Sequence, residues 1–123
     1  MPVQEVWDYL LGEGLPVWLG EVWLGENPGE RYRTASGTRG EVRSRSEGRR
    51  IRLTWQPQNA THDSTLQLTL IPAVRGTTIA VHQERLTSRA ERENLLDHWR
   101  GVLDALSTAL GARPTHMGRL GAE

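Results

Sequence analysis

Tryptophan is the residue type in this chain that points most directly to a chemical role. The chain has five Trp and two Tyr but no Phe. Trp is an unusual choice for filling a plain core, because its indole N–H needs a hydrogen-bond partner. If the segments that carry these rings fold onto one another, the rings either pack as core or line a cavity for an apolar or aromatic small molecule. The residues alone leave both interpretations open.

A candidate ligand-binding set follows from this pattern. Indole rings would form the apolar wall of a cavity, and one or two polar side chains would orient the ligand inside it. The set consists of Trp18, Trp23, Tyr32, Arg43, Trp55 and Trp99. The predicted partner is therefore an apolar or aromatic small molecule.

The sequence contains no recognisable catalytic or metal-binding motif. The four His residues lack the spacing of metal ligands, and no nucleophile elbow, phosphate-binding loop or dinucleotide fingerprint occurs. Without Cys, disulfides, thiolate metal sites and cysteine nucleophiles are excluded. We predict no cofactor, no metal and no catalytic residue, which favours a binding protein over an enzyme. Asp8 and His82 are the residues to replace if turnover is found.

Arginine is concentrated in one predicted hairpin. All fifteen basic residues are Arg, and fifteen Asp and Glu balance them, so the net charge is zero. The hairpin carries Arg39, Arg43, Arg45, Arg49, Arg50 and Arg52. Ser, Thr and Gln lie between these residues instead of the aromatic side chains of a nucleic-acid platform. We interpret the hairpin as a solvated sheet face and predict no nucleic-acid partner.

The segment 30–86 alternates between apolar and polar residues, which predicts an antiparallel meander with one covered and one solvated face. Turn residues separate the predicted strands, which are residues 31–35, 39–45, 50–56, 64–73 and 77–86. The expected inner face carries Ile51, Leu53, Trp55, Leu66, Leu68 and Leu70.

Helical periodicity marks both ends of the chain. Pro2 and the apolar spacing after it predict a short first helix, and residues 15–29 favour a short helix or an irregular lid. A capping box of Ser88 and Glu91 predicts the start of a long helix. Its apolar stripe must pack on the inner face of the sheet, so the sequence predicts an α+β fold of two layers.

The length of 123 residues corresponds to one domain. We place this domain at residues 1–112 and a polar C-terminal tail at residues 113–123. Gly111 and Pro114 are expected to end the long helix. No apolar run approaches the ~20 residues that span a bilayer. Met1 is not followed by a basic stretch and an apolar segment. We therefore expect a cytoplasmic protein without a membrane span.

An ordered set of residues resembles a known superfamily. The set is Val6-Trp7-Asp8-Tyr9-Leu10, Trp18, Gly40-Glu41-Val42, Arg52-Leu53-Thr54-Trp55, Ser64-Thr65-Leu66-Gln67-Leu68, Gly76-Thr77-Thr78-Ile79-Ala80-Val81-His82 and Trp99-x-x-x-Leu103-x-x-Leu106. Over about residues 2–110 the chain resembles the START-like (SRPBCC, helix-grip) superfamily. Within it, the chain is most similar to homologues of the activator of the heat-shock protein ninety ATPase.

The resemblance implies a curved antiparallel sheet wrapped around a long C-terminal helix, with a cavity between them that binds hydrophobic ligands in many members. It does not imply one activity. A cavity-based enzyme of the cyclase or hydrolase kind is one alternative. A protein-interaction or stress-response adaptor, related to the chaperone ATPase activators, is another.

The chain departs from the family pattern at its start. Family members usually begin with a strand before the first helix, whereas here the first helix follows Met1 directly. Either the native start lies upstream of Met1 or this strand has been lost, and its loss would leave the edge of the strand at residues 77–86 open to pairing. Either a second copy of the chain, giving a homodimer, or the tail after Arg113 is expected to fill it.

Overall fold

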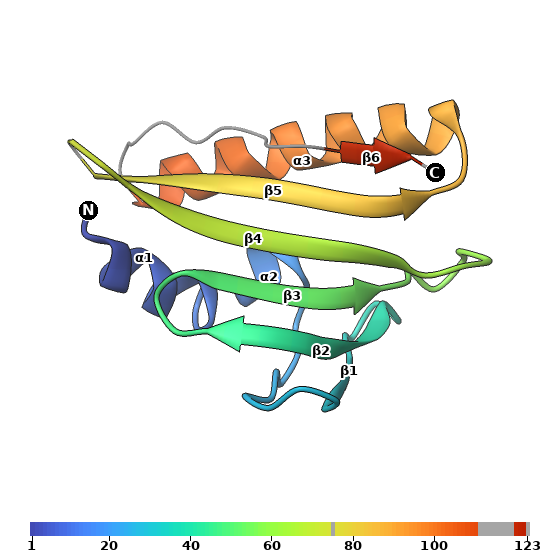
Figure 1. Ribbon diagram of the computed structural model, residues 1–123, viewed down its shortest axis with the longest axis horizontal. Coiled ribbons are helices and arrows are strands. Elements are labelled where there is room, and N and C mark those ends of the chain that lie inside the picture. Colours follow the sequence, from blue (N-terminus) through green and yellow to red (C-terminus); the bar gives the residue numbers. More distant parts are fainter. Residues whose placement is uncertain (75, 111–119, 123) are drawn as a thin grey trace.

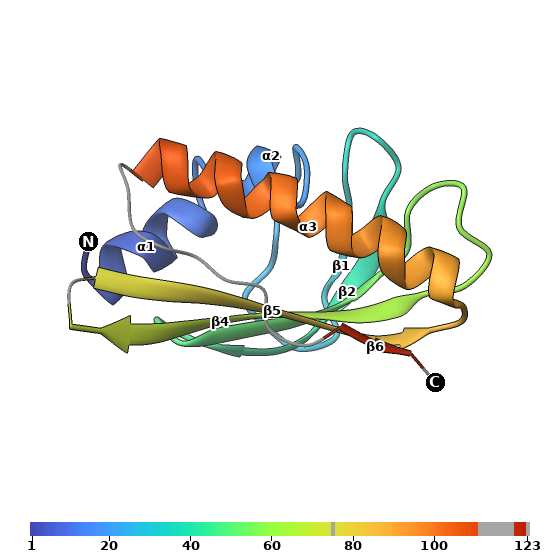
Figure 2. The same ribbon diagram turned by 90° about the horizontal axis from the view of Figure 1, so that it is seen from above.

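The computed structural model describes residues 1–74, 76–110 and 120–122. A sheet forms one layer, and all three helices of the described residues lie on one of its faces (Figures 1 and 2). The helices are α1 (Val3–Leu10), α2 (Leu15–Trp18) and α3 (Arg89–Leu110). The strands are β1 (Arg31–Arg33), β2 (Arg39–Ser46), β3 (Arg50–Trp55), β4 (Ser64–Ala73), β5 (Gly76–Leu86) and β6 (Leu120–Ala122).

Strand order in the sheet follows the sequence, from β1 to β6. The first five strands are antiparallel neighbours, as the meander pattern predicts. The register pairs Leu53 with Leu66 and Leu68 with Val81, which aligns the apolar residues of neighbouring strands on one face. The predicted α+β fold, a curved antiparallel sheet around a long C-terminal helix, is confirmed.

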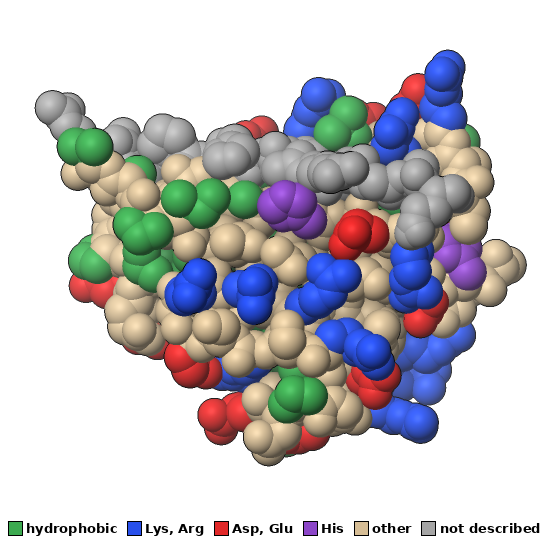
Figure 3. All heavy atoms as spheres, in the orientation of Figure 1, with side chains coloured by type: hydrophobic (Ala, Val, Ile, Leu, Met, Phe, Trp, Pro, Cys, Tyr) green, Lys and Arg blue, Asp and Glu red, His purple; other side chains and the backbone are tan. Residues whose placement is uncertain are grey.

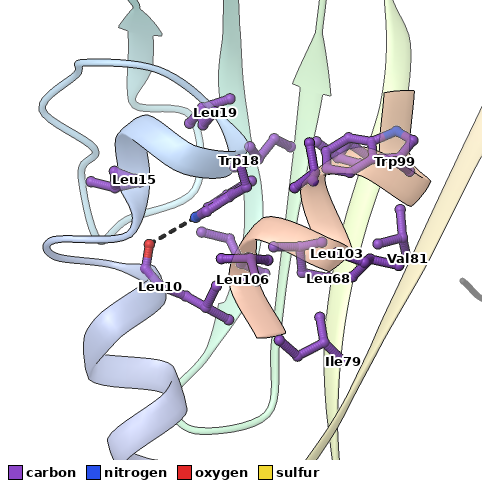
Figure 4. Close-up of a cluster of buried hydrophobic side chains, with 14 of the residues drawn as sticks. Leu10, Leu15, Trp18, Leu19, Leu68, Ile79, Val81, Trp99, Leu103 and Leu106 are labelled. Carbon is purple, nitrogen blue, oxygen red and sulfur yellow. Dashed lines mark hydrogen bonds between the residues drawn. The ribbon is translucent and has the colours of Figure 1, made fainter. Parts of the chain in front are cut away.

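Helix α3 lies across the apolar face of the sheet and completes the core. Trp99 is fully buried, and Leu103 and Leu106 follow it on the same stripe (Figure 4). They pack over sheet residues that include Leu68, Ile79 and Val81. Burying a side chain of this size contributes about 1.5–3 kcal/mol to folding. The stripe predicted from the helical period is therefore the contact between the two layers.

The two short helices are fixed by indole hydrogen bonds. Trp18 Nε1 donates to the Leu10 carbonyl oxygen at 2.8 Å, a group that the end of α1 leaves unpaired (Figure 4). Trp7 Nε1 donates to Glu47 Oε2 at 2.7 Å in the turn between β2 and β3. The partners that Trp requires when it is buried are thus supplied by α1 and by a hairpin turn.

A β-bulge in β2 changes which residues face inward. The register between β2 and β3 shifts between Val42 and Ser44, so Arg45 comes to lie opposite the buried Ile51. The Arg45 guanidinium lies 5.8 Å from the ring centre of Trp7. Simple alternation along the strand could not predict this, because a bulge inserts one residue and inverts the faces beyond it.

The edge of β5 is partly covered by the C-terminal segment. β6 pairs with β5 in parallel, with Gln83 opposite Leu120 and Leu86 opposite Ala122. Of the two expected ways of filling this edge, pairing with the tail is therefore observed along Gln83 to Leu86. The predicted helix-ending residues at 111 and 114 lie outside the described residues.

Candidate functional site

A cavity of about 360 Å³ lies where the first turns of α3 meet the sheet. Figure 2 shows the connection between β3 and β4 rising beside this end of the helix. The lining residues come from the end of β3, this connection, the start of β4 and the start of α3: Trp55, Pro57, Ala60, His62, Ser64, Glu91, Asn94 and Leu95. Most of the exposed wall is apolar, although four of the eight lining residues carry polar side chains.

Trp55 forms the aromatic wall of the cavity. Its ring centre lies 6.5 Å from that of the fully buried Trp99, and the two planes are tilted by 47°. His98 packs edge-on against Trp99 at 4.9 Å, and partial burial lowers the pKa of its imidazole. Trp55 itself is only half-buried and lines the cavity. Thus Trp99 supports Trp55 from the core, and Trp55 is the indole available to a ligand.

His62 and Glu91 form a polar pair in the wall. His62 Nε2 lies 2.9 Å from Glu91 Oε2, and His62 Nδ1 lies 2.8 Å from the Asp63 carbonyl oxygen. Both ring nitrogens therefore face hydrogen-bond acceptors. Glu91 Oε1 in turn accepts from the Thr87 N–H at 2.7 Å and from Thr87 Oγ1 at 3.2 Å. The pair joins the β3–β4 connection to the start of α3.

The Glu91 carboxylate is held in its charged form. Burial raises its pKa, but the Thr87 N–H, the charge of His62 and the side-chain hydrogen bonds from Thr87 and His62 together outweigh burial, so the pKa is lowered. The predicted capping box is present in modified form: the Glu91 N–H donates to Ser88 Oγ at 3.1 Å, whereas the carboxylate caps the N–H of Thr87. One residue therefore both caps α3 and lines the cavity.

A buried chain of hydrogen bonds connects the core with the cavity. Trp99 Nε1 donates to Gln83 Oε1 at 2.7 Å, and Gln83 Nε2 donates to Ser64 Oγ at 2.9 Å. Ser64 Oγ then donates to the Trp55 carbonyl oxygen at 3.3 Å. Each buried polar atom of Gln83 has a partner, as burial requires. The chain fixes the backbone of Trp55 relative to α3.

Three of the residues predicted to bind a ligand lie in or near the interior between the layers. Trp55 lines the cavity, and Trp99 lies behind it. Trp18 is buried, but its N–H is used by α1 and it does not line the cavity (Figure 4). The space between Trp55 and Trp99 is occupied by the rings themselves, so the open volume lies at the start of α3.

The other three predicted residues lie elsewhere. The Trp23 side chain is 74% exposed on the surface. Tyr32 is buried and donates from its hydroxyl to the Thr54 carbonyl oxygen at 2.6 Å; burial raises the pKa of this hydroxyl. Arg43 lies on the opposite face of the sheet and pairs with Glu41 at 2.8 Å. None of the three lines the cavity beside α3.

His62, Glu91 and Asn94 were missed as site residues at the level of sequence. The sequence could have indicated them only through the topology of the sheet. Since β4 begins beside the end of β5, the segment before β4 must lie beside the residues that begin α3.

Asp8 and His82, the residues to replace if turnover is found, do not line the cavity. In the described residues, no group of three or more His, Asp or Glu side chains is placed to hold a metal ion. No described helix is long and apolar enough to cross a membrane.

Several solved structures share the fold. The chain is 22% identical to CalU16 from Micromonospora echinospora, with a TM-score of 0.73 over 89% of this chain and 69% of that one. It is 18% identical to DynU16, a protein in the dynemicin biosynthetic locus, with a TM-score of 0.73 over 89% of this chain and 43% of that one. It is 15% identical to PFC0360w, an HSP90 activator from Plasmodium falciparum, with a TM-score of 0.65 over 92% and 91% of the two chains.

These identities are low enough that the structures establish the fold and no activity. No curated protein matches the chain. Residues 1–111 match the family described as activator of Hsp90 ATPase homolog 1-like protein. The match covers nearly the whole chain and agrees with the START-like fold, so the protein belongs to the family of activator of Hsp90 ATPase homolog 1-like proteins.

Proposed function

We propose that the protein binds a small apolar or aromatic molecule in the cavity beside the start of α3. The observation that carries this proposal is the combination of the Trp55 wall with the open volume of about 360 Å³ next to it. This volume is near the lower end for ligand sites, which range over roughly 300–1,000 Å³. A ligand of one or two fused aromatic rings fits such a volume.

The polar groups of the cavity suit orientation of a ligand. Ser64, His62 and Glu91 already have hydrogen-bond partners within the described part of the chain. Asn94, by contrast, lines the cavity without a side-chain hydrogen bond among the described residues. A ligand with one hydroxyl or carbonyl group could therefore exchange a hydrogen bond with the Asn94 amide while its rings contact Trp55 and Leu95.

The geometry supports binding over catalysis. A general base needs a nitrogen or oxygen that is free to take a proton from a substrate. His62 directs both ring nitrogens at acceptors, and both oxygens of Glu91 accept hydrogen bonds from within the chain. The His62–Glu91 pair therefore stabilises the wall of the cavity. The solved structures with the same fold do not indicate one role either, since one protein belongs to a biosynthetic locus and another is an HSP90 activator.

Isothermal titration calorimetry with a neutral aromatic probe, 2-naphthol, tests the proposal. We expect saturable binding that is lost in Ala60→Leu, because the added methyl groups occupy the cavity. The matched control is Ala105→Leu on the exposed face of α3, which should bind like the wild type. Absence of saturable binding across a panel of neutral one- and two-ring compounds would overturn the proposal, as would unchanged binding in Ala60→Leu.

A further inference from the structure

The face of the sheet opposite the helices carries a second hollowed region, which we call the outer groove. One part, of about 660 Å³, lies over β1, β2 and the end of β3. The other part, of about 340 Å³, continues across β2 to β5. The two parts share Glu41, Thr54 and Asp63 in their walls, so they adjoin. Figure 3 shows Arg side chains crossing this face of the molecule.

The lining of the outer groove is strongly cationic. Its arginines are Arg31, Arg33, Arg39, Arg43, Arg52 and Arg85. Among the described residues, only two acidic ones, Glu41 and Asp63, line it with them. Because the whole chain is neutral, this excess is a local separation of charge and not a consequence of a basic protein.

Three of these six arginines form ion pairs with carboxylates of the same chain. Arg43 pairs with Glu41 at 2.8 Å, and Arg85 pairs with Asp63 at 3.0 Å. A third pair joins Arg52 to a carboxylate outside the lining, that of Glu84, at 3.0 Å. These pairs use both acidic side chains that line the groove in the described part of the chain, which leaves neither for the β1 end.

At the β1 end, Arg31, Arg33 and Arg39 make no side-chain hydrogen bond or ion pair with any described residue. Moreover, Arg33 lies directly opposite Arg39 in the register of β1 and β2. Like charges at opposed positions of an antiparallel pair destabilise it. All three residues line the same hollow, so one bound anion could relieve the repulsion between their charges.

We propose that the outer groove binds a soluble small molecule with adjacent phosphate groups, held by Arg31, Arg33 and Arg39. A guanidinium group presents planar, paired donors that match phosphate oxygens, and several such groups around one hollow match a chain of phosphates. A nucleic-acid strand is disfavoured, because none of the described aromatic side chains is exposed in the groove for bases to stack on. The site is separate from the cavity beside α3, which lies on the other side of the sheet.

Calorimetric titration of the full chain with inorganic tripolyphosphate tests this site. We expect saturable binding that weakens by about tenfold or more in Arg31→Gln/Arg39→Gln, since charge-assisted hydrogen bonds are lost. The control is Arg92→Gln/Arg100→Gln, which removes the same charge from exposed positions on α3 and should bind as the wild type does. Glu41→Gln should strengthen binding, because it removes a negative charge from the groove.

The proposal would be overturned by a lack of saturable tripolyphosphate binding, by equal losses in the two double variants, or by weaker binding in Glu41→Gln. Stronger association with vesicles that contain phosphatidic acid than with tripolyphosphate would also overturn it, in favour of a membrane surface. Binding of 2-naphthol should be unchanged in Arg31→Gln/Arg39→Gln. That measurement separates failure of this site from failure of the cavity beside α3.

Discussion

Trp99 Nε1 on α3 lies 2.7 Å from Gln83 Oε1 on β5, and both side chains are fully buried. This hydrogen bond is a polar connection between the two layers in the core. Through Ser64 it continues to the backbone of Trp55 in the cavity wall. The stability of the fold and the shape of the cavity therefore depend on the same buried amide.

Replacement of Gln83 by Leu should destabilise the protein by about 1–3 kcal/mol, because the Trp99 N–H and the Ser64 hydroxyl lose a partner in a buried site. Urea denaturation followed by circular dichroism measures the change. The comparison is Gln67→Leu, which alters a half-buried Gln on the outer face and should cost less. Equal effects of the two substitutions would contradict the role assigned to Gln83.

Stability should fall in acid more steeply in the wild type than in Glu91→Gln. The pKa of Glu91 is lowered in the folded state from its ordinary value of 4.5, so its contribution is complete above that value and is lost as pH falls through the folded-state pKa. Urea denaturation midpoints between about pH 6 and about pH 3 report the difference. Glu93→Gln, an exposed position on α3, should keep the wild-type pH dependence. Parallel curves for the wild type and Glu91→Gln would refute the assignment.

Two glycine substitutions should have opposite effects. A Cβ atom at Gly40 would overlap the backbone carbonyl group of Thr54, so Gly40→Ala should destabilise the protein by about 1–3 kcal/mol. A Cβ atom at Gly101, on the exposed side of α3, meets nothing within 4 Å. Gly101→Ala should therefore stabilise by about 0.5–1 kcal/mol through helix propensity. Thermal denaturation distinguishes them, and a stabilising Gly40→Ala would be inconsistent with the packing of β2 on β3.

Deletion of residues 111–123 should promote self-association. β6 pairs with β5 between Gln83 and Leu86, and its removal exposes unpaired backbone groups at this edge. Size-exclusion chromatography with light scattering should show a larger dimer fraction for the truncated chain than for the full chain at equal concentration. The homodimer expected from an open edge remains a prediction, and two chains with the same monomer fraction would count against it.

The main elements of the fold could be predicted because their signals are local. Alternation fixes the inward positions of Ile51, Leu53 and Trp55, and the helical period fixes the stripe of α3. The bulge at Arg43 carried no local signal, so the inward position of Arg45 could not be foreseen. Bulges depend on the pairing of two strands and not on one segment.

The candidate site was harder to predict than the fold, because it depends on distant residues. His62 and Glu91 are 29 positions apart and meet only when the β4–β5 hairpin has its observed register. The aromatic composition drew attention to Trp55, which the structure places beside an open volume. It could not separate Trp55 from Trp23, since exposure of Trp23 is decided by the irregular path of the chain between α2 and β1.

The most direct test of ligand binding beside α3 is the spectrum of the five indole N–H groups during titration with 2-naphthol, recorded by ¹H–¹⁵N correlation. We expect the Trp55 resonance to shift most and saturably, with a smaller shift for Trp99, because only Trp55 lines the cavity and Trp99 contacts it. The resonances of Trp7, Trp18 and Trp23 should stay in place. Saturable shifts at Trp18 or Trp23 without a change at Trp55 would contradict the assignment of this cavity as the ligand site.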